Sequence, residues 1–354
     1  MEPKSADRWG ATLNAARTAA RFCDEKIGWN RVGMLLSIAI IAIAIIALLR
    51  ILKDIDLEEL LDALRASDPR DIALASLFVA AGYFTLTFYD LFALHTIGRA
   101  DVPYRVAALA AFTSYSVGHN VGATVFTGGA VRYRIYSAWS LDAIEVAKLC
   151  FVAGLTFWLG NATVLGLGIA YEPNAASAIN QLPPVVNRLL AILVLAILAS
   201  YVAWVWWAPR TIGRDGWKVR LPGGPLTLLQ VAIGIVDLSF CALAMYMLIP
   251  DEPSIGFVKV AVIFVSATLL GFASHAPGGI GVFDAAMLVA LLHMDKQFDK
   301  EELLAGLLLF RLLYYIAPFI VSLLILGVRE LTLALRAPAP ALPPARADGK
   351  TAAE

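Results

Sequence analysis

The stretch SHAPGGIGVFDAAM, residues 274–287, decides how this chain is expected to fold. It lies in a longer apolar region, and no Lys, Arg, Asp or Glu occurs from Val260 to Phe283. A simple spanning helix has no need for Pro and several Gly at its centre, because these residues interrupt or loosen helical backbone. Backbone that leaves the helix inside a bilayer must find hydrogen-bond partners in protein or water. The stretch therefore predicts a protected, polar-lined break, with an outgoing helix that begins near Gly281.

Composition places the chain among polytopic helical membrane proteins. Hydrophobic residues make up 60% of its 354 residues, charged residues make up only 16%, and the mean hydropathy is +0.74. A soluble domain of this size could not bury that much apolar surface. The formal net charge is +0, and the Cys residues lie apart without a CxxC spacing. We therefore expect no nucleic-acid partner, no metal ion and no other cofactor.

Eight apolar segments are expected to cross or enter the bilayer, in which about 20 helical residues cover roughly 30 Å. Two of them are abnormal, because 106–127 contains the sequence GHNVG and 257–294 is too long for one crossing. The sequence predicts an all-α polytopic membrane protein with six spanning helices and two opposed re-entrant helical hairpins. The eight segments are residues 32–49, 72–98, 106–127, 145–170, 188–207, 225–249, 257–294 and 302–327.

The distribution of Lys and Arg favours two hairpins over two additional crossings. If both abnormal segments return to the side from which they enter, 19 Lys and Arg lie on the inner side and 8 lie on the outer side. If each abnormal segment crosses once instead, the split becomes nearly even. Inner loops of membrane proteins carry an excess of Lys and Arg. The first hairpin is therefore expected to open inward and the second outward, with both termini in the cytoplasm.

The chain is divided into three parts by this assignment. Residues 1–31 form a basic cytoplasmic segment, either an amphipathic helix on the membrane surface or a disordered tail. Residues 32–327 form the transmembrane domain, and the Pro- and Ala-rich residues 328–354 form a disordered cytoplasmic tail. Leucines at helical spacing within residues 57–64 predict a short amphipathic helix on the outer surface.

Three charged residues inside apolar segments are candidate substrate-binding groups. Arg311 is expected to face the bundle interior, because an unpaired Arg in the bilayer is costly, and its planar fork suits a lipid phosphate. The alternative for Arg311 is a structural ion pair with Asp284 or Asp237. Asp284 is expected one turn into the outgoing helix, where the helix dipole favours a carboxylate, so it is either a structural cap or a substrate contact. Asp237 is a lone carboxylate within its segment.

The break in the second hairpin is a candidate anion site. The free N–H groups and the positive dipole end of the outgoing helix would suit a lipid phosphate. Gly278, Gly279 and Gly281 allow close approach of the backbone. The alternative is a packing kink without a ligand. His275 is expected either to hydrogen-bond in its neutral form at the helix end or to titrate.

The first hairpin offers a second group of candidate residues around GHNVG (118–122) and TGGAVRYRIY (127–136). His119 and Asn120 would place polar groups deep in the bilayer. Arg132 and Arg134 are expected at the level of the inner lipid headgroups. There they would either follow the positive-inside rule against anionic lipid or capture a phospholipid headgroup from the inner leaflet.

Together, these stretches resemble the transmembrane flippase-like domain of the lysylphosphatidylglycerol synthetase/flippase family. The resemblance covers most of residues 32–327 and is carried by residues 118–145, HAPGGIGVFD at 275–284 and FRLLYYIAP at 310–318. It implies a domain that moves aminoacylated phosphatidylglycerol from the inner to the outer leaflet, which alters surface charge and resistance to cationic peptides. The positions that it marks are Arg132, Arg134, Glu145, Pro277, Gly278, Gly279, Gly281, Asp284 and Arg311, with Asp284 standing where the family usually has Glu.

The function expected from the sequence is that of a phospholipid flippase in the bacterial cytoplasmic membrane. No GxSxG, P-loop or HExxH motif is present, which favours a transporter over an enzyme. Two alternatives stay open: a membrane-embedded lipid-modifying or glycosyl-transfer enzyme, and a scaffold for a separate synthetase. The expected partners are an anionic or aminoacylated phospholipid, a separate lipid synthetase and further copies of the chain.

Overall fold

A computed structural model describes residues 29–53, 57–208, 210–214 and 217–336. Most of the two expected terminal segments, residues 1–28 and 337–354, lies outside the described residues. The described chain is almost entirely helical, and one short antiparallel hairpin is formed by β1 (Thr211–Arg214) and β2 (Trp217–Arg220). The expected all-α polytopic class is therefore confirmed.

Six helices of the described chain are long and apolar enough to cross a membrane, judged by length and composition. Five of them coincide with expected spans. The sixth, Pro277–Met294, belongs to the second predicted hairpin, and the expected span 32–49 lies within the helix Trp29–Lys53. The other five are Pro69–Thr96, Ala143–Tyr171, Pro184–Trp207, Gly224–Tyr246 and Lys300–Leu333.

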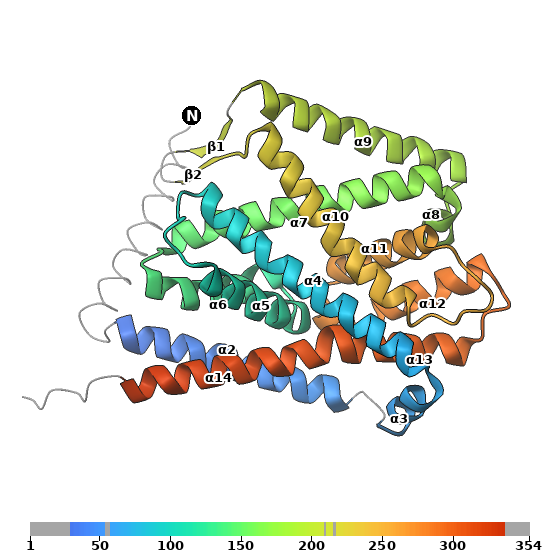
Figure 1. The fold of residues 1–354 in the computed structure, drawn as a ribbon, viewed down its shortest axis with the longest axis horizontal. Coiled ribbons are helices and arrows are strands. Elements are labelled where there is room, and N and C mark those ends of the chain that lie inside the picture. Colours follow the sequence, from blue (N-terminus) through green and yellow to red (C-terminus); the bar gives the residue numbers. More distant parts are fainter. Residues whose placement is uncertain (1–28, 54–56, 209, 215–216, 337–354) are drawn as a thin grey trace, which may run out of the picture.

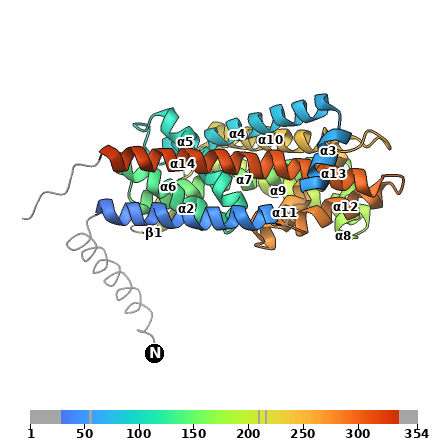
Figure 2. The same ribbon diagram turned by 90° about the horizontal axis from the view of Figure 1, so that it is seen from below.

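The long helices pack side by side along one axis (Figure 1). Figure 2 shows α2 and α14 lying next to each other along the length of the molecule. Small residues allow close crossings in the interior, as helix packing in membranes requires. At the crossing of α7 and α10, a Cβ on Gly160 would lie 2.7 Å from the Cα of Gly234. The helices outside the two hairpins are α2 (Trp29–Lys53), α3 (Leu57–Ala66), α4 (Pro69–Thr96), α7 (Ala143–Tyr171), α8 (Pro173–Asn180), α9 (Pro184–Trp207), α10 (Gly224–Tyr246), α13 (Lys300–Phe310) and α14 (Ala317–Arg336).

Both abnormal segments form pairs of helices joined by a sharp turn. The first pair is α5 (Tyr104–Val121) and α6 (Thr124–Tyr136), and the chain reverses at Gly122 and Ala123, where φ is 83° and 45°. The second pair is α11 (Phe257–Ala273) and α12 (Val282–Met294). At about 1.5 Å per residue, α6 and α12 are each roughly 20 Å long, which is less than the hydrocarbon thickness.

The turn of the second pair lies at the predicted break. A short 3-10 helix, η3 (Pro277–Gly279), separates α11 from α12, and α12 begins directly after Gly281 as predicted. His275 and the three glycines have positive φ, which glycine adopts without strain and other residues adopt rarely. The glycines are therefore needed for the shape of this turn.

The turns of the two helix pairs, which we call the two tips, meet inside the molecule. A Cβ on Gly122 would lie 3.5 Å from Pro277 Cα, so the two backbones are in close contact. Figure 1 shows the α5–α6 pair towards the end that carries β1 and β2, and the α11–α12 pair towards the opposite end with α8. The predicted opposition of the pairs matches this arrangement, while their re-entry into a membrane stays a prediction.

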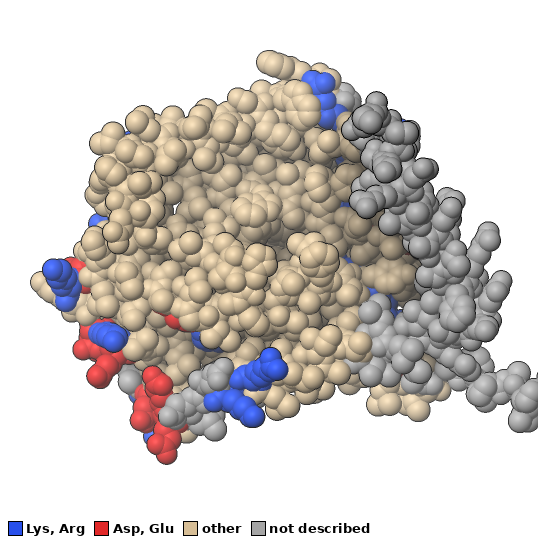
Figure 3. All heavy atoms as spheres, turned by 180° about the vertical axis from the view of Figure 1, so that it is seen from behind, with Lys and Arg blue, Asp and Glu red and all other residues tan. Residues whose placement is uncertain are grey.

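Charged side chains are distributed unevenly over the surface. Figure 3 shows a broad uncharged face, with acidic side chains gathered near the end that carries α3. The predicted amphipathic helix at 57–64 is present as α3, which places Glu58, Glu59 and Asp62 on its exposed side. Basic side chains also lie at the opposite end of this face (Figure 3), and an uncharged band between charged ends is the surface expected of a protein that spans a bilayer.

Candidate functional site

Arg311 and Asp284 form an ion pair that holds the second tip. Arg311 begins a π-helical turn, η4 (Arg311–Ile316), and its Nε donates to Asp284 Oδ1 at 2.8 Å while its Nη2 donates to Oδ2. Asp284 Oδ2 also accepts from the backbone N–H of Gly281 at 3.0 Å. Arg311 Nη1 donates to the carbonyl of Gly278 at 3.3 Å. The structural pairing that the sequence left open for Arg311 is therefore the one that the structure shows.

The π-helical turn also anchors the neighbouring helices. Carbonyl groups in such a turn lose their regular α-helical partners and must be satisfied elsewhere. The Tyr314 carbonyl accepts from the hydroxyl of Tyr83 at 3.0 Å, and the Tyr315 carbonyl accepts from Asn120 Nδ2 at 3.1 Å. Asn120, predicted as a polar group at depth, thus ties the first hairpin to η4. Its Oδ1 is buried and has no hydrogen-bond partner among the described residues.

A cavity of about 260 Å³ lies where the two tips meet, and we call it the central cavity. Three of the predicted polar residues line it: His119, Arg132 and His275. Gly278 and Gly279 contribute the backbone of the second tip. The pair formed by Arg311 and Asp284 is not part of the lining, so it supports the tip from behind. The cavity is also lined by Tyr115, Cys150, Gly154 and Phe157.

Arg132 lines the central cavity and is buried inside the bundle. Its side chain is only 6% exposed and forms a bidentate ion pair with the fully buried Asp90, with Nη2 to Oδ1 at 2.7 Å. The Tyr136 hydroxyl donates to Asp90 Oδ2 at 2.8 Å, and the Arg132 guanidinium lies 4.6 Å from the ring centre of Tyr115. Burial is tolerated because the charge is paired and stacked on an aromatic ring. Arg132 Nη1 takes no part in the hydrogen bonds to the Asp90 carboxylate.

Asp237 lies deeper in the bundle, behind the central cavity. It is 4% exposed, and its Oδ2 accepts from the Tyr89 hydroxyl at 2.9 Å. Oδ1 has only the thiol of Cys241 nearby, at 4.0 Å. No described Lys or Arg forms an ion pair with Asp237. The predicted lone carboxylate is therefore found without a cation.

An apolar groove continues from the central cavity between α6 and α7. Its volume is about 730 Å³, and it shares Val125, Cys150, Gly154 and Trp158 with the central cavity. Several of its side chains are open to the outside, with Val125 74% exposed and Trp158 61% exposed. We call this feature the lateral groove. The cavity, with its polar groups between the tips, and the groove, with its apolar lining at the surface, are therefore neighbouring spaces.

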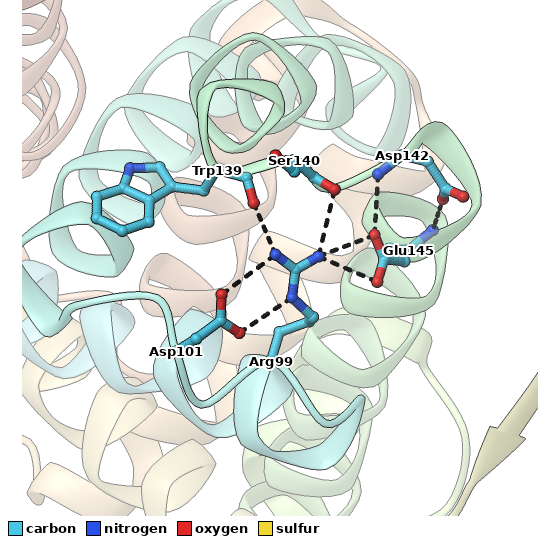
Figure 4. A network of polar contacts seen from close by, with 6 residues as sticks. All are labelled: Arg99, Asp101, Trp139, Ser140, Asp142 and Glu145. Atoms are coloured by element: carbon cyan, nitrogen blue, oxygen red, sulfur yellow. Dashed lines mark hydrogen bonds and ion pairs between the residues drawn. The ribbon is translucent and has the colours of Figure 1, made fainter.

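Glu145, which the family resemblance marks, lies in a separate cluster at one end of α7. Arg99 Nη1 donates to both Glu145 oxygens at 3.1 and 3.0 Å, and Arg99 Nη2 donates to the Trp139 carbonyl at 2.6 Å (Figure 4). Glu145 and Asp142 also form a reciprocal cap of α7. The hydrogen bond from Arg99 lowers the pKa of Asp101, which lies in the same exposed loop. This cluster joins α4 to α7 and does not line the central cavity.

Arg134 also lies away from the central cavity. Its Nη2 donates to Glu330 Oε2 at 2.6 Å, which joins α6 to α14, and Arg329 donates to the other oxygen of Glu330 at 2.8 Å. Arg134 differs in this from Arg132, although the two are only two residues apart. The helical rotation of about 100° per residue turns Arg132 inward and Arg134 towards α14.

Several residues of the site were not predicted from the sequence. Tyr89 and Tyr115 were not singled out, because a Tyr in an apolar segment has no distinctive pattern. Gly154 was also not predicted, because a glycine on a spanning helix usually marks a close contact with another helix. A Cβ on Gly154 would meet no atom within 4 Å, which shows that this glycine borders open space.

The fold and the site together define a polytopic helical membrane protein with an internal polar cavity. The chain belongs to the family described as "Lysylphosphatidylglycerol synthase TM region", which matches residues 34–322. This match covers nearly the whole expected transmembrane domain, and it confirms the family resemblance that the motifs indicated.

Relatives of this chain fall into two groups by length. The "Inner membrane protein YbhN" of Escherichia coli is 29% identical over 289 residues, which cover 80% of this chain and 87% of that protein. Protein slr0712 of Synechocystis sp. is 28% identical over 260 residues, 73% of this chain and 80% of that protein. The "Phosphatidylglycerol lysyltransferase" of Staphylococcus haemolyticus is 25% identical over 254 residues, which cover 71% of this chain but 29% of the lysyltransferase. The similarity to lysyltransferases is therefore confined to a part of those proteins.

Proposed function

We propose that this protein is a phospholipid translocase of the bacterial inner membrane that moves an aminoacylated or related phosphatidylglycerol between leaflets. The observation that carries the proposal is that the central cavity adjoins the lateral groove and shares four lining residues with it. A phospholipid has a charged head and long apolar chains, and the cavity offers polar groups while the groove beside it is apolar. The family and its lysyltransferase relatives support a lipid as the cargo.

Arg132 is the group that we assign to the lipid phosphate. It lines the central cavity, and its Nη1 is free of the pair with Asp90. A guanidinium donor in a largely apolar site binds phosphate oxygen strongly, because charge-assisted hydrogen bonds gain strength away from water. The backbone of Gly278 and Gly279 approaches the same space without side chains in the way. Arg311 and Asp284 then act as positioning residues that hold this backbone in place.

The acyl chains are assigned to the lateral groove. Its lining is aliphatic and aromatic, and its exposed residues face the region that a bilayer would occupy. A groove that is open to the bilayer lets the chains remain in apolar surroundings while the headgroup moves through the protein. In this arrangement the two hairpins re-enter the membrane from opposite sides. Their tips separate the route by which lipid enters from the inner leaflet from the route to the outer leaflet.

The proposal is tested with the full chain reconstituted into liposomes that carry a trace of fluorescent phosphatidylglycerol. A membrane-impermeant quencher added outside reports the fraction of label in the outer leaflet over time. We expect faster transbilayer movement than in protein-free vesicles, and faster movement of phosphatidylglycerol or its lysyl ester than of phosphatidylcholine. Equal rates with and without protein would rule out translocation. Formation of a new covalent lipid product would instead support the alternative of a lipid-modifying enzyme.

A further inference from the structure

Asp237 has surroundings that differ from those of Asp90 and Asp284. Those two carboxylates each form a bidentate pair with an arginine, whereas Asp237 has one hydroxyl donor and no described cation. Burying an unpaired carboxylate costs far more free energy than burying a neutral carboxyl group. The carboxyl group of Asp237 is therefore suited to exist in both its charged and its neutral form.

A small chamber lies next to Asp237. Its volume is about 30 Å³, and Asp237 and His119 both line it. Tyr115, His119 and Phe157 are shared with the central cavity, so the chamber lies directly behind that cavity. The lining is largely apolar, but a space of this size can hold a water molecule where polar groups such as Asp237 and His119 are present to bind it. His119 Nδ1 is buried without a hydrogen-bond partner among the described residues, so it has free capacity for such a bridge.

The groups that face Asp237 are otherwise neutral. The neighbouring α11 supplies Phe264, Thr268 and Phe272 to the chamber, and α7 supplies only Phe157. The titratable groups near the carboxylate are Tyr83 and Tyr89 on α4, Tyr115 and His119 on α5, Cys241 on α10, and Tyr314 and Tyr315 on η4. Of these, the imidazole of His119 has two ring nitrogens, so it can accept a proton at one nitrogen and release a proton from the other.

We infer that Asp237 is a proton-binding site that couples the proposed lipid movement to a proton gradient, with His119 as the relay from the central cavity. In the loading step, a hydronium ion in the central cavity gives a proton to one nitrogen of His119 and becomes water. The other nitrogen releases its proton through the chamber water to Asp237 Oδ1. One N–H bond forms as another breaks, and the carboxylate becomes a neutral carboxyl group. The reverse steps release the proton.

The size of the chamber decides between a proton and the lipid headgroup as the ligand of Asp237. An aminoacyl ammonium group was a candidate partner for this carboxylate. A space of about 30 Å³ holds about one or two water molecules and is too small for a lysyl headgroup. Tyr89 and Cys241 already occupy the immediate surroundings of the carboxylate. A proton carried by water needs no larger space.

The inference rests on the proposed function for its coupling, but the proton site itself is tested without any lipid movement. Difference infrared spectra of the full chain in lipid nanodiscs, recorded between mildly acidic and alkaline pH, report the C=O stretch of protonated carboxyl groups. We expect a titrating band that shifts in heavy water and is lost in Asp237→Asn. The band should persist in Asp62→Asn, which removes an exposed carboxylate on α3. A band that survives Asp237→Asn, or the absence of a titrating band, would overturn the inference.

The coupling is tested in a second arm with a pH gradient imposed across liposomes. If one proton moves with each lipid, a gradient of one pH unit can shift the ratio of lipid between leaflets by up to about tenfold. The wild type and Asp62→Asn should show a shift towards this limit, and Asp237→Asn should show none. A wild type that moves lipid without any response to the gradient refutes coupling but not translocation. A titrating Asp237 in a protein that moves no lipid refutes the proposed function but not the proton site.

Discussion

Replacement of Gly154 by Leu should slow lipid movement without destabilising the fold. Gly154 lies at the junction of the central cavity and the lateral groove, and a Cβ there meets no atom within 4 Å. Gly in a helix interior costs roughly 0.8–1 kcal/mol relative to Ala, and Leu has nearly the propensity of Ala. We therefore expect the stability of the variant to stay unchanged or to rise by up to about 1 kcal/mol.

The same side chain would obstruct the path of the lipid. A lipid that passes must displace the added Leu, and crowding of this kind costs about 1–3 kcal/mol. Since 1.36 kcal/mol corresponds to a factor of ten in rate, transbilayer movement should slow by about 5- to 150-fold. The rate is measured with fluorescent phosphatidylglycerol and an external quencher, and the stability is measured by thermal unfolding in the same detergent.

Gly327→Leu is the matched control for this experiment. Gly327 lies in α14, and a Cβ there also meets no atom within 4 Å, but the residue lines neither the cavity nor the groove. This variant should keep the wild-type rate. Equal rates for Gly154→Leu and the wild type, at equal amounts of reconstituted protein, would refute the assignment of the lipid path.

Three further predictions concern the stability of the fold. Arg311→Met should destabilise the protein by about 3 kcal/mol, because it leaves a partly buried carboxylate unpaired, and adding Asp284→Leu should recover most of this loss in thermal unfolding. Gly160→Ala should lower the midpoint of unfolding through a cost of about 1–3 kcal/mol, because its Cβ would collide with α10, and an unchanged midpoint would contradict the close crossing. The hydrogen bond from Arg99 holds the pKa of Asp101 below its ordinary value, so its contribution to stability is complete above about pH 4 and is lost as the pH falls through the lower folded pKa. Thermal unfolding followed from about pH 6 to about pH 3 should therefore depend less on pH in Asp101→Asn than in the wild type.

The second tip shows how far sequence reasoning reaches in this protein. Pro and Gly in an apolar segment have few structural uses, so the break and a helix that begins near Gly281 could be predicted, and α12 begins at Val282. The carboxylate of Asp284 could be placed in the first turn of α12 on the same grounds. The partner of Arg311 could be named only as Asp284 or Asp237, because separation in the sequence says nothing of distance in space.

The central cavity shows where this reasoning stops. Arg132 and Arg134 are equivalent in a count of charges, and only the packing of α6 against α4 and α14 turns one inward and the other towards Glu330. The π-helical turn at Arg311 has no sequence signature, although it frees the carbonyls that hold Asn120. The role of Gly154 follows from the open space beside it, which only the structure shows.

Photo-crosslinking from inside the central cavity tests the central claim most directly. A photoreactive amino acid in place of Phe157, which lines the cavity, is activated in membranes that contain both anionic and zwitterionic phospholipid, and the adducts are identified by mass spectrometry. The same group in place of Leu324, which is 64% exposed on α14, reports the composition of the surrounding bilayer. We predict adducts at position 157 that are enriched in anionic phospholipid relative to those at position 324. No lipid adduct at position 157 would contradict the account.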